Sequence, residues 1–123
     1  MIYLPDVTLV IVDDVAHELA TMAVHECTKH VVFRQIDIHT DDPGRIPVSE
    51  ANYYKTPKFV TKDDVMWYLW QEVPKSVTTS HFLYIQWDSW VINGARWTPE
   101  FLEYDYVGAP WPWQSTASAL SGT

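Results

Sequence analysis

A chain of 123 residues, of which 47% are hydrophobic, can bury a core as one small domain, and this composition excludes a disordered polyelectrolyte. Its formal net charge of −8 and its scattered cations exclude a protein that coats nucleic acid, because phosphate backbones would be repelled. No apolar run approaches the roughly 20 residues of a membrane span. Cys27 is the single cysteine and no secretory signal is recognisable, so we expect a cytoplasmic protein without a membrane span or an internal disulfide.

The first third of the sequence has the pattern of a strand, a helix and a second strand. Residues 8–12, Thr-Leu-Val-Ile-Val, form a nearly continuous apolar run that is typical of a strand buried on both faces. Residues 17–28 have helical spacing, which places Leu19, Ala20, Ala23 and Cys27 on one stripe. A second strand is expected over residues 31–38. Two strands joined by a helix at this spacing predict a βαβ unit, and therefore a parallel sheet.

The middle of the chain predicts a loop, a helix and a third strand. Residues 41–57 are polar and rich in proline, and we interpret them as a loop. Thr61 and Asp64 have the spacing of a capping box, so a helix is expected over residues 62–73, ending before Pro74. A third strand is expected over residues 81–87. The predicted fold class is α/β, with three layers and a mainly parallel sheet.

Carboxylates follow the predicted strands directly. Asp88 comes immediately after the third strand, where open α/β sheets bind ligands, although it could equally cap the following turn. Asp13 and Asp14 follow the first strand. We assign the helix-capping role to Asp14, which leaves Asp13 free to face a ligand.

A second polar group alternates along the end of the second strand. Asp37, His39 and Asp41 have period-two spacing, which places them on one face and permits a metal site. The alternative is that these side chains are solvated or form a turn. The four glycines are far apart, so P-loop and dinucleotide-binding loops are absent. Among the tryptophans, Trp87 and Trp97 are expected in the core.

Two sequence blocks resemble a known domain family. The first is Gln86-Trp87-Asp88, and the second begins at Trp97 and reads Trp-Thr-Pro-Glu-Phe-Leu-Glu-Tyr-Asp-Tyr-Val-Gly-Ala-Pro-Trp-Pro-Trp, ending at Trp113. They resemble an uncharacterised bacterial family that is regarded as glycosyltransferase-like. The resemblance implies the GT-A fold of nucleotide-diphospho-sugar transferases, and this fold is Rossmann-like. The resemblance implies a nucleotide-sugar donor as the ligand.

The resemblance also implies site residues. The segment from Gln86 to Asp88 takes the place of the Asp-x-Asp element of GT-A enzymes, which holds a divalent metal, Mn²⁺ or Mg²⁺, on the diphosphate of the donor. Only Asp88 is acidic here, so it is the one implied metal ligand, and Gln86 replaces the other carboxylate. Asp13 matches a position near the nucleoside, and Thr40 and Asp41 match the segment after the second strand. The implied donor-binding residues are therefore Asp13, Thr40, Asp41, Gln86 and Asp88.

The resemblance extends to Trp113 and sets the expected domain organisation. Residues 1–113 are interpreted as the nucleotide-sugar-binding half of a partial GT-A domain, and residues 114–123 as a flexible tail. In the family, a further half supplies the acceptor contacts and usually the general base. We therefore expect weak donor binding without transfer, and self-association through apolar sheet surface is plausible.

Two other functions stay open at this point. One is a non-catalytic module that binds a nucleotide or sugar in the same pocket. The other is a metal-dependent hydrolase that uses Asp37, His39, Asp41 and Asp88 as a metal centre.

Overall fold

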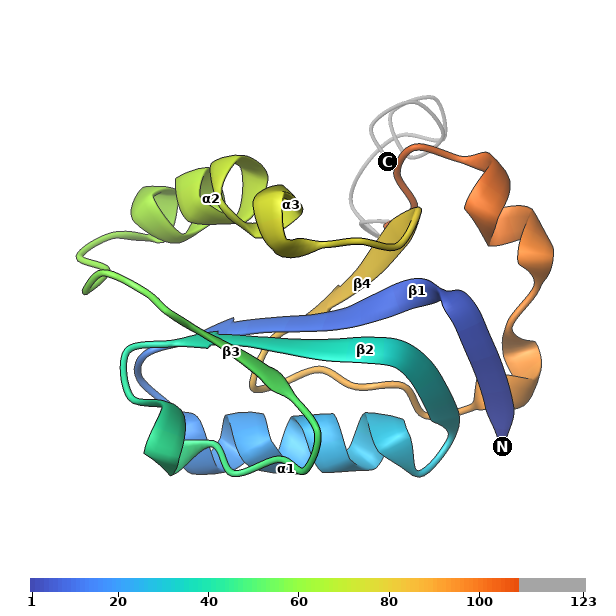
Figure 1. Cartoon of the computed structure of the whole chain (residues 1–123), viewed down its shortest axis with the longest axis horizontal. Helices are drawn as coiled ribbons and strands as arrows, with labels where there is room; N and C mark the ends of the chain where they lie inside the picture. Colours follow the sequence, from blue (N-terminus) through green and yellow to red (C-terminus); the bar gives the residue numbers. More distant parts are fainter. Residues whose placement is uncertain (109–123) are drawn as a thin grey trace, which may run out of the picture.

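The computed structural model describes residues 1–108, which form a four-stranded parallel sheet with helices on both faces (Figure 1). The elements in chain order are β1 (Ile2–Asp13), α1 (His17–Thr28), β2 (Val31–Thr40), β3 (Asn52–Lys55), α2 (Lys62–Gln71), α3 (Val73–Ser76) and β4 (His81–Ile85). Short 3₁₀ turns cover Pro43–Arg45, Gly94–Arg96 and Pro99–Glu103. The strand order is β3-β2-β1-β4, and every neighbouring pair is parallel. The predicted α/β class with a parallel sheet is confirmed.

The strand β1 is buried on both faces, as its nearly continuous apolar sequence indicates. Leu9 and Ile11 pack toward α1, whereas Val10 and Val12 pack toward α2 and α3. This alternation divides the core into two clusters, one on each face of the sheet. Figure 1 shows the corresponding layers, with α1 below the sheet and α2 and α3 above it.

The bounds of α1 agree with the prediction, but its buried stripe differs by one position. His17, Ala20, Ala23, Val24 and Cys27 are the buried residues of this helix. Leu19 is 47% exposed, so its expected place on the core stripe is wrong. Leu19 is rotated about 100° from Ala20 around the helix, which turns it away once Ala20 and Val24 face the sheet.

The expected loop over residues 41–57 is wrong in part, because it contains the strand β3. Asn52–Lys55 pair with β2 in parallel register, from Asp37 opposite Asn52 to Thr40 opposite Lys55. The capping box at the start of α2 is confirmed, since Thr61 Oγ1 accepts the Asp64 amide at 3.2 Å and Asp64 Oδ2 accepts the Thr61 amide at 3.0 Å.

The proline after α2 does not stop helical structure. α2 ends at Gln71, and Pro74 lies in the first turn of α3. A first-turn amide has no intrahelical acceptor, so a proline without N–H is tolerated there. Within residues 1–108, no helix is long and apolar enough to span a membrane.

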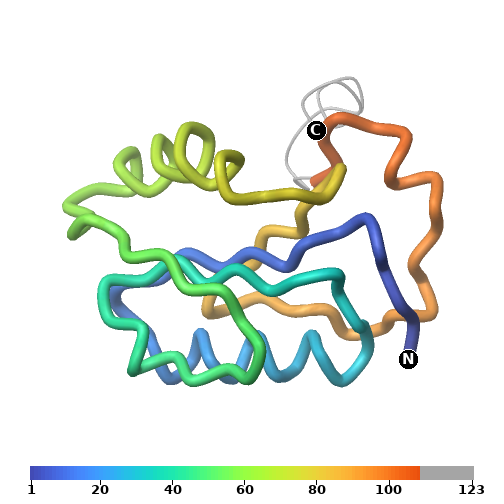
Figure 2. Tube along the Cα trace, in the orientation of Figure 1, coloured from blue at the N-terminus to red at the C-terminus, as the bar shows by residue number. Residues whose placement is uncertain are grey.

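The strand β4 ends at Ile85, and residues 86–89 form a turn. Trp87 lies in this turn and is 42% exposed, so its assignment to the core is wrong. Trp97 is half-buried against the α1-side cluster and packs edge-on against Phe101. Figure 2 shows the segment after β4, in orange, running below the sheet before it climbs past the N-terminus.

The path of this segment buries Cys27, whose Sγ accepts the Val91 amide at 3.2 Å. The expected tail over residues 114–123, and Trp113 at the end of the second block, lie outside the described residues.

Candidate functional site

The sheet topology marks one edge as the place for a ligand. From β1, the sheet is extended to one side by β2 and then β3, whereas β4 is added on the other side of β1. The connection through α1 lies on one face, and that through α2 and α3 lies on the other (Figure 1). In open α/β sheets, ligands bind beyond the carboxyl ends of the strands at such a reversal point. The region beyond the carboxyl ends of β1 and β4 is therefore the candidate site.

The strand register brings the predicted residues to this edge. Asp13 at the end of β1 lies opposite Thr40 at the end of β2. Ile11 lies opposite Ile85, the last residue of β4, so the turn that holds Asp88 begins level with the end of β1. All three strand ends share one edge, as parallel pairing requires.

The turn after β4 presents Asp88 to solvent. The Gln86 amide donates to Ser89 Oγ at 2.9 Å, and the Ser89 amide donates to the Gln86 carbonyl at 3.1 Å, which closes the turn. Asp88 is exposed, and in the part of the chain that the structure describes its carboxylate has no hydrogen bond or ion pair. Ser89, not Asp88, therefore stabilises the turn, which leaves the Asp88 carboxylate available.

Tyr84 lies near the carboxyl end of β4, just before the turn that holds Asp88. Burial raises the pKa of its phenol, and the negative charges of Asp13 and Asp88 raise that pKa further. The Gln86 side-chain amide also donates to Tyr84 Oη, at 3.4 Å.

Asp13 is not free to face a ligand. Its side chain is 4% exposed, and Oδ2 accepts the Ala16 amide at 3.0 Å just before α1. Burial raises the pKa of this carboxyl, and the Ala16 amide and the His17 charge oppose the increase. Asp14 accepts the Phe59 amide at 3.2 Å, and no side chain among residues 1–108 caps the start of α1, so the capping role predicted for Asp14 is wrong.

Thr40 and Asp41 are held at the end of β2 by a partner in α1. His17 Nε2 and Asp41 Oδ1 are 2.7 Å apart, and this hydrogen bond lowers the pKa of the Asp41 carboxyl. The Asp41 side chain is 32% exposed, whereas Thr40 is fully buried and its Oγ1 lies 3.4 Å from Asp41 Oδ1. Asp41 is thus oriented, with part of its surface open to solvent.

The proposed alignment of Asp37, His39 and Asp41 on one face is wrong. β2 ends at Thr40, so the alternation does not continue to Asp41, which turns to the α1 side and pairs with His17. Asp37 and His39 are buried on the opposite face. Asp37 accepts hydrogen bonds from Gln35, Asn52 and Ser76, and His39 Nδ1 is bonded to Tyr68 Oη at 2.8 Å.

These placements decide what the edge can do with a metal. Within residues 1–108, no group of three or more His, Cys, Asp or Glu side chains is arranged to hold an ion. Asp88 remains as one exposed carboxylate. Mg²⁺ commonly binds through one or two carboxylates together with the phosphates of a substrate, so the residues present fit a metal that arrives with a diphosphate.

Two residues of this edge were missed by the sequence interpretation. His17 was treated only as the beginning of a helix, and Tyr84 only as part of a strand. The signal for Tyr84 is its place two residues before Gln86, which puts both on one face of the strand predicted over residues 81–87, although β4 itself ends at Ile85. His17 had no local signal, since its partner Asp41 lies on another strand.

One family comparison bears on this region. Residues 66–122 match the family described as protein of unknown function (DUF5672). The matched segment includes Tyr84, Gln86 and Asp88. The comparisons with curated proteins and with solved structures gave no match.

Proposed function

We propose that this chain is a glycosyltransferase-like domain of the GT-A type that binds a nucleotide-sugar donor beyond the carboxyl ends of β1 and β4. The observation that carries the proposal is the position of Tyr84, Gln86 and the exposed Asp88 at the carboxyl end of β4, beside the reversal point of the sheet, where Gln86 donates to Tyr84 Oη. This is where the fold class binds nucleotides, and the resemblance of the Gln86–Asp88 element supplies the ligand class.

In this proposal the residues have separate roles. Asp88 holds Mg²⁺ or Mn²⁺ against the diphosphate, whose oxygens complete the coordination. Gln86 donates a side-chain hydrogen bond to the same group. Asp41 flanks the nucleoside and is oriented by His17, whereas the buried Thr40 supports Asp41 through its Oγ1. Asp13 shapes the turn into α1 through its bond to Ala16, and therefore supports the site without contacting the donor.

A non-catalytic module that binds a nucleotide or sugar is the second candidate. It is favoured by the lack of a preformed acidic cluster at this edge, because Asp13 and Asp41 are already hydrogen-bonded and Asp88 is one exposed carboxylate. The hydrolase is not supported, because Asp37 and His39 are buried on the face opposite the His17–Asp41 pair.

The test is calorimetric titration of the full chain with UDP- and GDP-sugars, with and without Mn²⁺. Asp88→Asn keeps the shape of the side chain and removes its charge, so we expect metal-dependent affinity to fall at least roughly tenfold. Asp6→Asn is the matched control, since Asp6 is exposed on β1 toward the amino end of the sheet. Equal binding by the wild type and by Asp88→Asn would remove Asp88 from the site and contradict the proposal.

A donor-turnover assay separates the two candidates. Turnover that Asp88→Asn abolishes supports an enzyme. Metal-dependent binding without turnover supports the module.

A further inference from the structure

A hollow lies between β3 and the layer of α2 and α3, away from the candidate site at the ends of β1 and β4. Its volume is about 720 Å³, which is within the range of small-molecule sites. The lining residues come from β2, β3, α2, α3 and the α2–α3 junction, and they are His39, Tyr53, Tyr54, Lys55, Tyr68, Glu72, Lys75 and Ser76. Since β3 is at the far end of the strand order from β4, this hollow is separate from the proposed donor site at the ends of β1 and β4.

The floor of the hollow is aromatic and contains an unpaired polar atom. His39 is 2% exposed and stacks beneath Tyr54, with ring centroids 4.8 Å apart and an angle of 19° between the planes. Its Nδ1 is bonded to Tyr68 Oη, but its buried Nε2 has no hydrogen-bond partner among residues 1–108. A buried polar atom without a partner is unfavourable, so a protein of this size contains few of them.

The rim of the hollow is positively charged in a chain whose net charge is −8. Four of the five lysines lie between residues 55 and 75, and two of them, Lys55 and Lys75, line the hollow. Lys55 forms no ion pair within the described residues. Lys75 pairs with Glu72 at 3.2 Å, but its side chain is 71% exposed, and such pairs are weak enough to exchange for a ligand anion.

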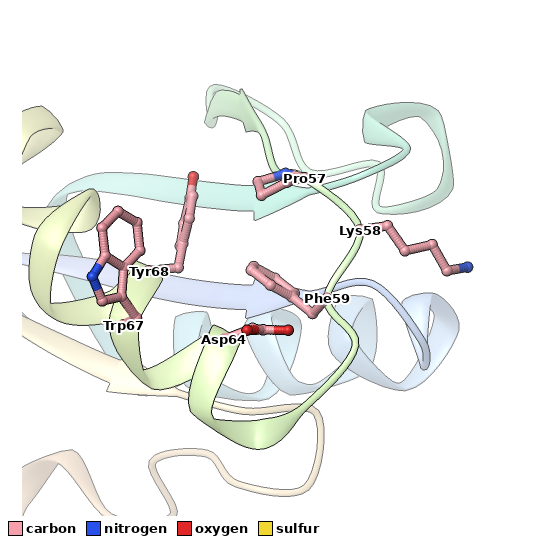
Figure 3. Close-up of a pocket in the computed structure, with 6 residues that line it drawn as sticks. All are labelled: Pro57, Lys58, Phe59, Asp64, Trp67 and Tyr68. Carbon is pink, nitrogen blue, oxygen red and sulfur yellow. The ribbon is translucent and has the colours of Figure 1, made fainter.

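A smaller neighbouring hollow of about 290 Å³ shares Tyr68 but is less suited to a ligand (Figure 3). Its acidic residue, Asp64, is occupied by the amides of Val60 and Thr61. The Lys58 side chain extends away from the cluster of rings in Figure 3. The larger hollow therefore combines two lysines, a stacking ring and a buried polar atom without a partner among residues 1–108, a combination that the smaller one lacks.

We propose that the hollow beside β3 binds a small organic anion built on a flat ring, with the ring against Tyr54 and the anionic group between Lys55 and Lys75. Aromatic side chains favour stacking of flat rings, and paired ammonium groups favour a carboxylate or phosphate. His39 Nε2 lies at the floor, where a polar substituent of the ligand reaches it when the Tyr54 ring shifts. This site is independent of the proposed donor site, and neither proposal requires the other.

The experiment is a titration of the ¹⁵N-labelled full chain with phenyl phosphate, followed by NMR. We expect saturable shifts of the Tyr54, Lys55 and Ser76 amides, and an affinity roughly fivefold or more above that for inorganic phosphate. Lys75→Gln should weaken binding by roughly fivefold, which corresponds to one exposed charge contact. Lys29→Gln is the matched control, because Lys29 forms the same i,i+3 pair with Glu26, at 2.7 Å on α1.

Three results would overturn the proposal. The first is the absence of saturable shifts with phenyl phosphate up to about 10 mM, a range that includes weak small-ligand binding. The second is equal binding of phenyl phosphate and inorganic phosphate, which would remove the ring from the recognition. The third is equal weakening by Lys29→Gln and Lys75→Gln. Both lysines are exposed, so these variants should fold, and an unchanged amide spectrum outside the substituted region verifies this.

Discussion

The buried imidazole of His39 predicts a specific loss of stability in mild acid. Burial lowers the pKa of His39 from 6.5 to about 4. The unfolded chain then takes up a proton at a higher pH than the folded chain, so acidification favours unfolding. The stabilisation is complete above pH 6.5 and decreases as the pH falls toward 4. The lowered pKa of His39 contributes about 3 kcal/mol to the free energy of unfolding when the imidazole is neutral in both states. About 2 kcal/mol of this contribution is lost between pH 7.5 and pH 5.

The measurement compares urea unfolding at about pH 7.5 and about pH 5, followed by tryptophan fluorescence. Asp13 and Asp37 act in the opposite direction, because burial raises the pKa of each and their protonation stabilises the folded state. The informative quantity is therefore the difference between the wild type and His39→Leu. We expect the change in unfolding free energy between the two pH values to be about 2 kcal/mol more favourable in the variant.

The control for this prediction is His25→Gln, since His25 is exposed on α1. It should retain the pH dependence of the wild type. His39→Leu also removes the hydrogen-bond partner of Tyr68. This loss of stability is the same at both pH values, so it cancels from the difference between them. If the variant loses as much stability in acid as the wild type, the argument from a buried neutral imidazole is refuted.

Two further predictions concern packing, each with a control in the same kind of element. Ile38→Ala removes a fully buried side chain from β2 and should lower the unfolding free energy, measured in urea, by about 2–5 kcal/mol. Val32 is 46% exposed on the same strand, so Val32→Ala should change this free energy by less than about 0.5 kcal/mol. Gly94→Ala should destabilise by about 1–3 kcal/mol, because its Cβ would lie 2.8 Å from the His30 carbonyl oxygen. Gly44→Ala, whose Cβ would meet its nearest atom at 3.7 Å, should lack this effect, and equal melting temperatures of the two glycine variants would contradict the prediction.

The βαβ unit was predictable because its signals are local. The apolar run in β1 needs burial on both faces, and the spacing of Ala20, Ala23 and Cys27 suits a helix that packs on one face of a sheet. β3 gave no such signal, since Asn-Tyr-Tyr-Lys is short and polar and becomes a strand only because β2 offers it an open edge. The exposure of Trp87 also depended on a non-local fact, namely where β4 stops.

The candidate site was predictable in position and less so in detail. Parallel topology brings strand ends to one edge, so the neighbourhood of Asp13 and Asp88 followed from chain order alone. The hydrogen bonds that distinguish these residues did not follow. Asp41 is oriented by His17, and Asp14 by the Phe59 amide, through contacts between segments far apart in sequence.

The central position of β1 has a consequence for the order of folding. Ile11 pairs with Ile38 after a short connection, but it pairs with Ile85 only after most of the chain has been made. Closing the longer loop loses more chain entropy, so β1, α1 and β2 should associate first and β4 should dock late. A φ-value near zero for Leu83→Ala, with a clearly higher value for Ile38→Ala, is the kinetic signature of this order, and the reverse pattern would contradict it. The candidate site, which lies at the ends of β1 and β4, would then be the last part of the sheet to form.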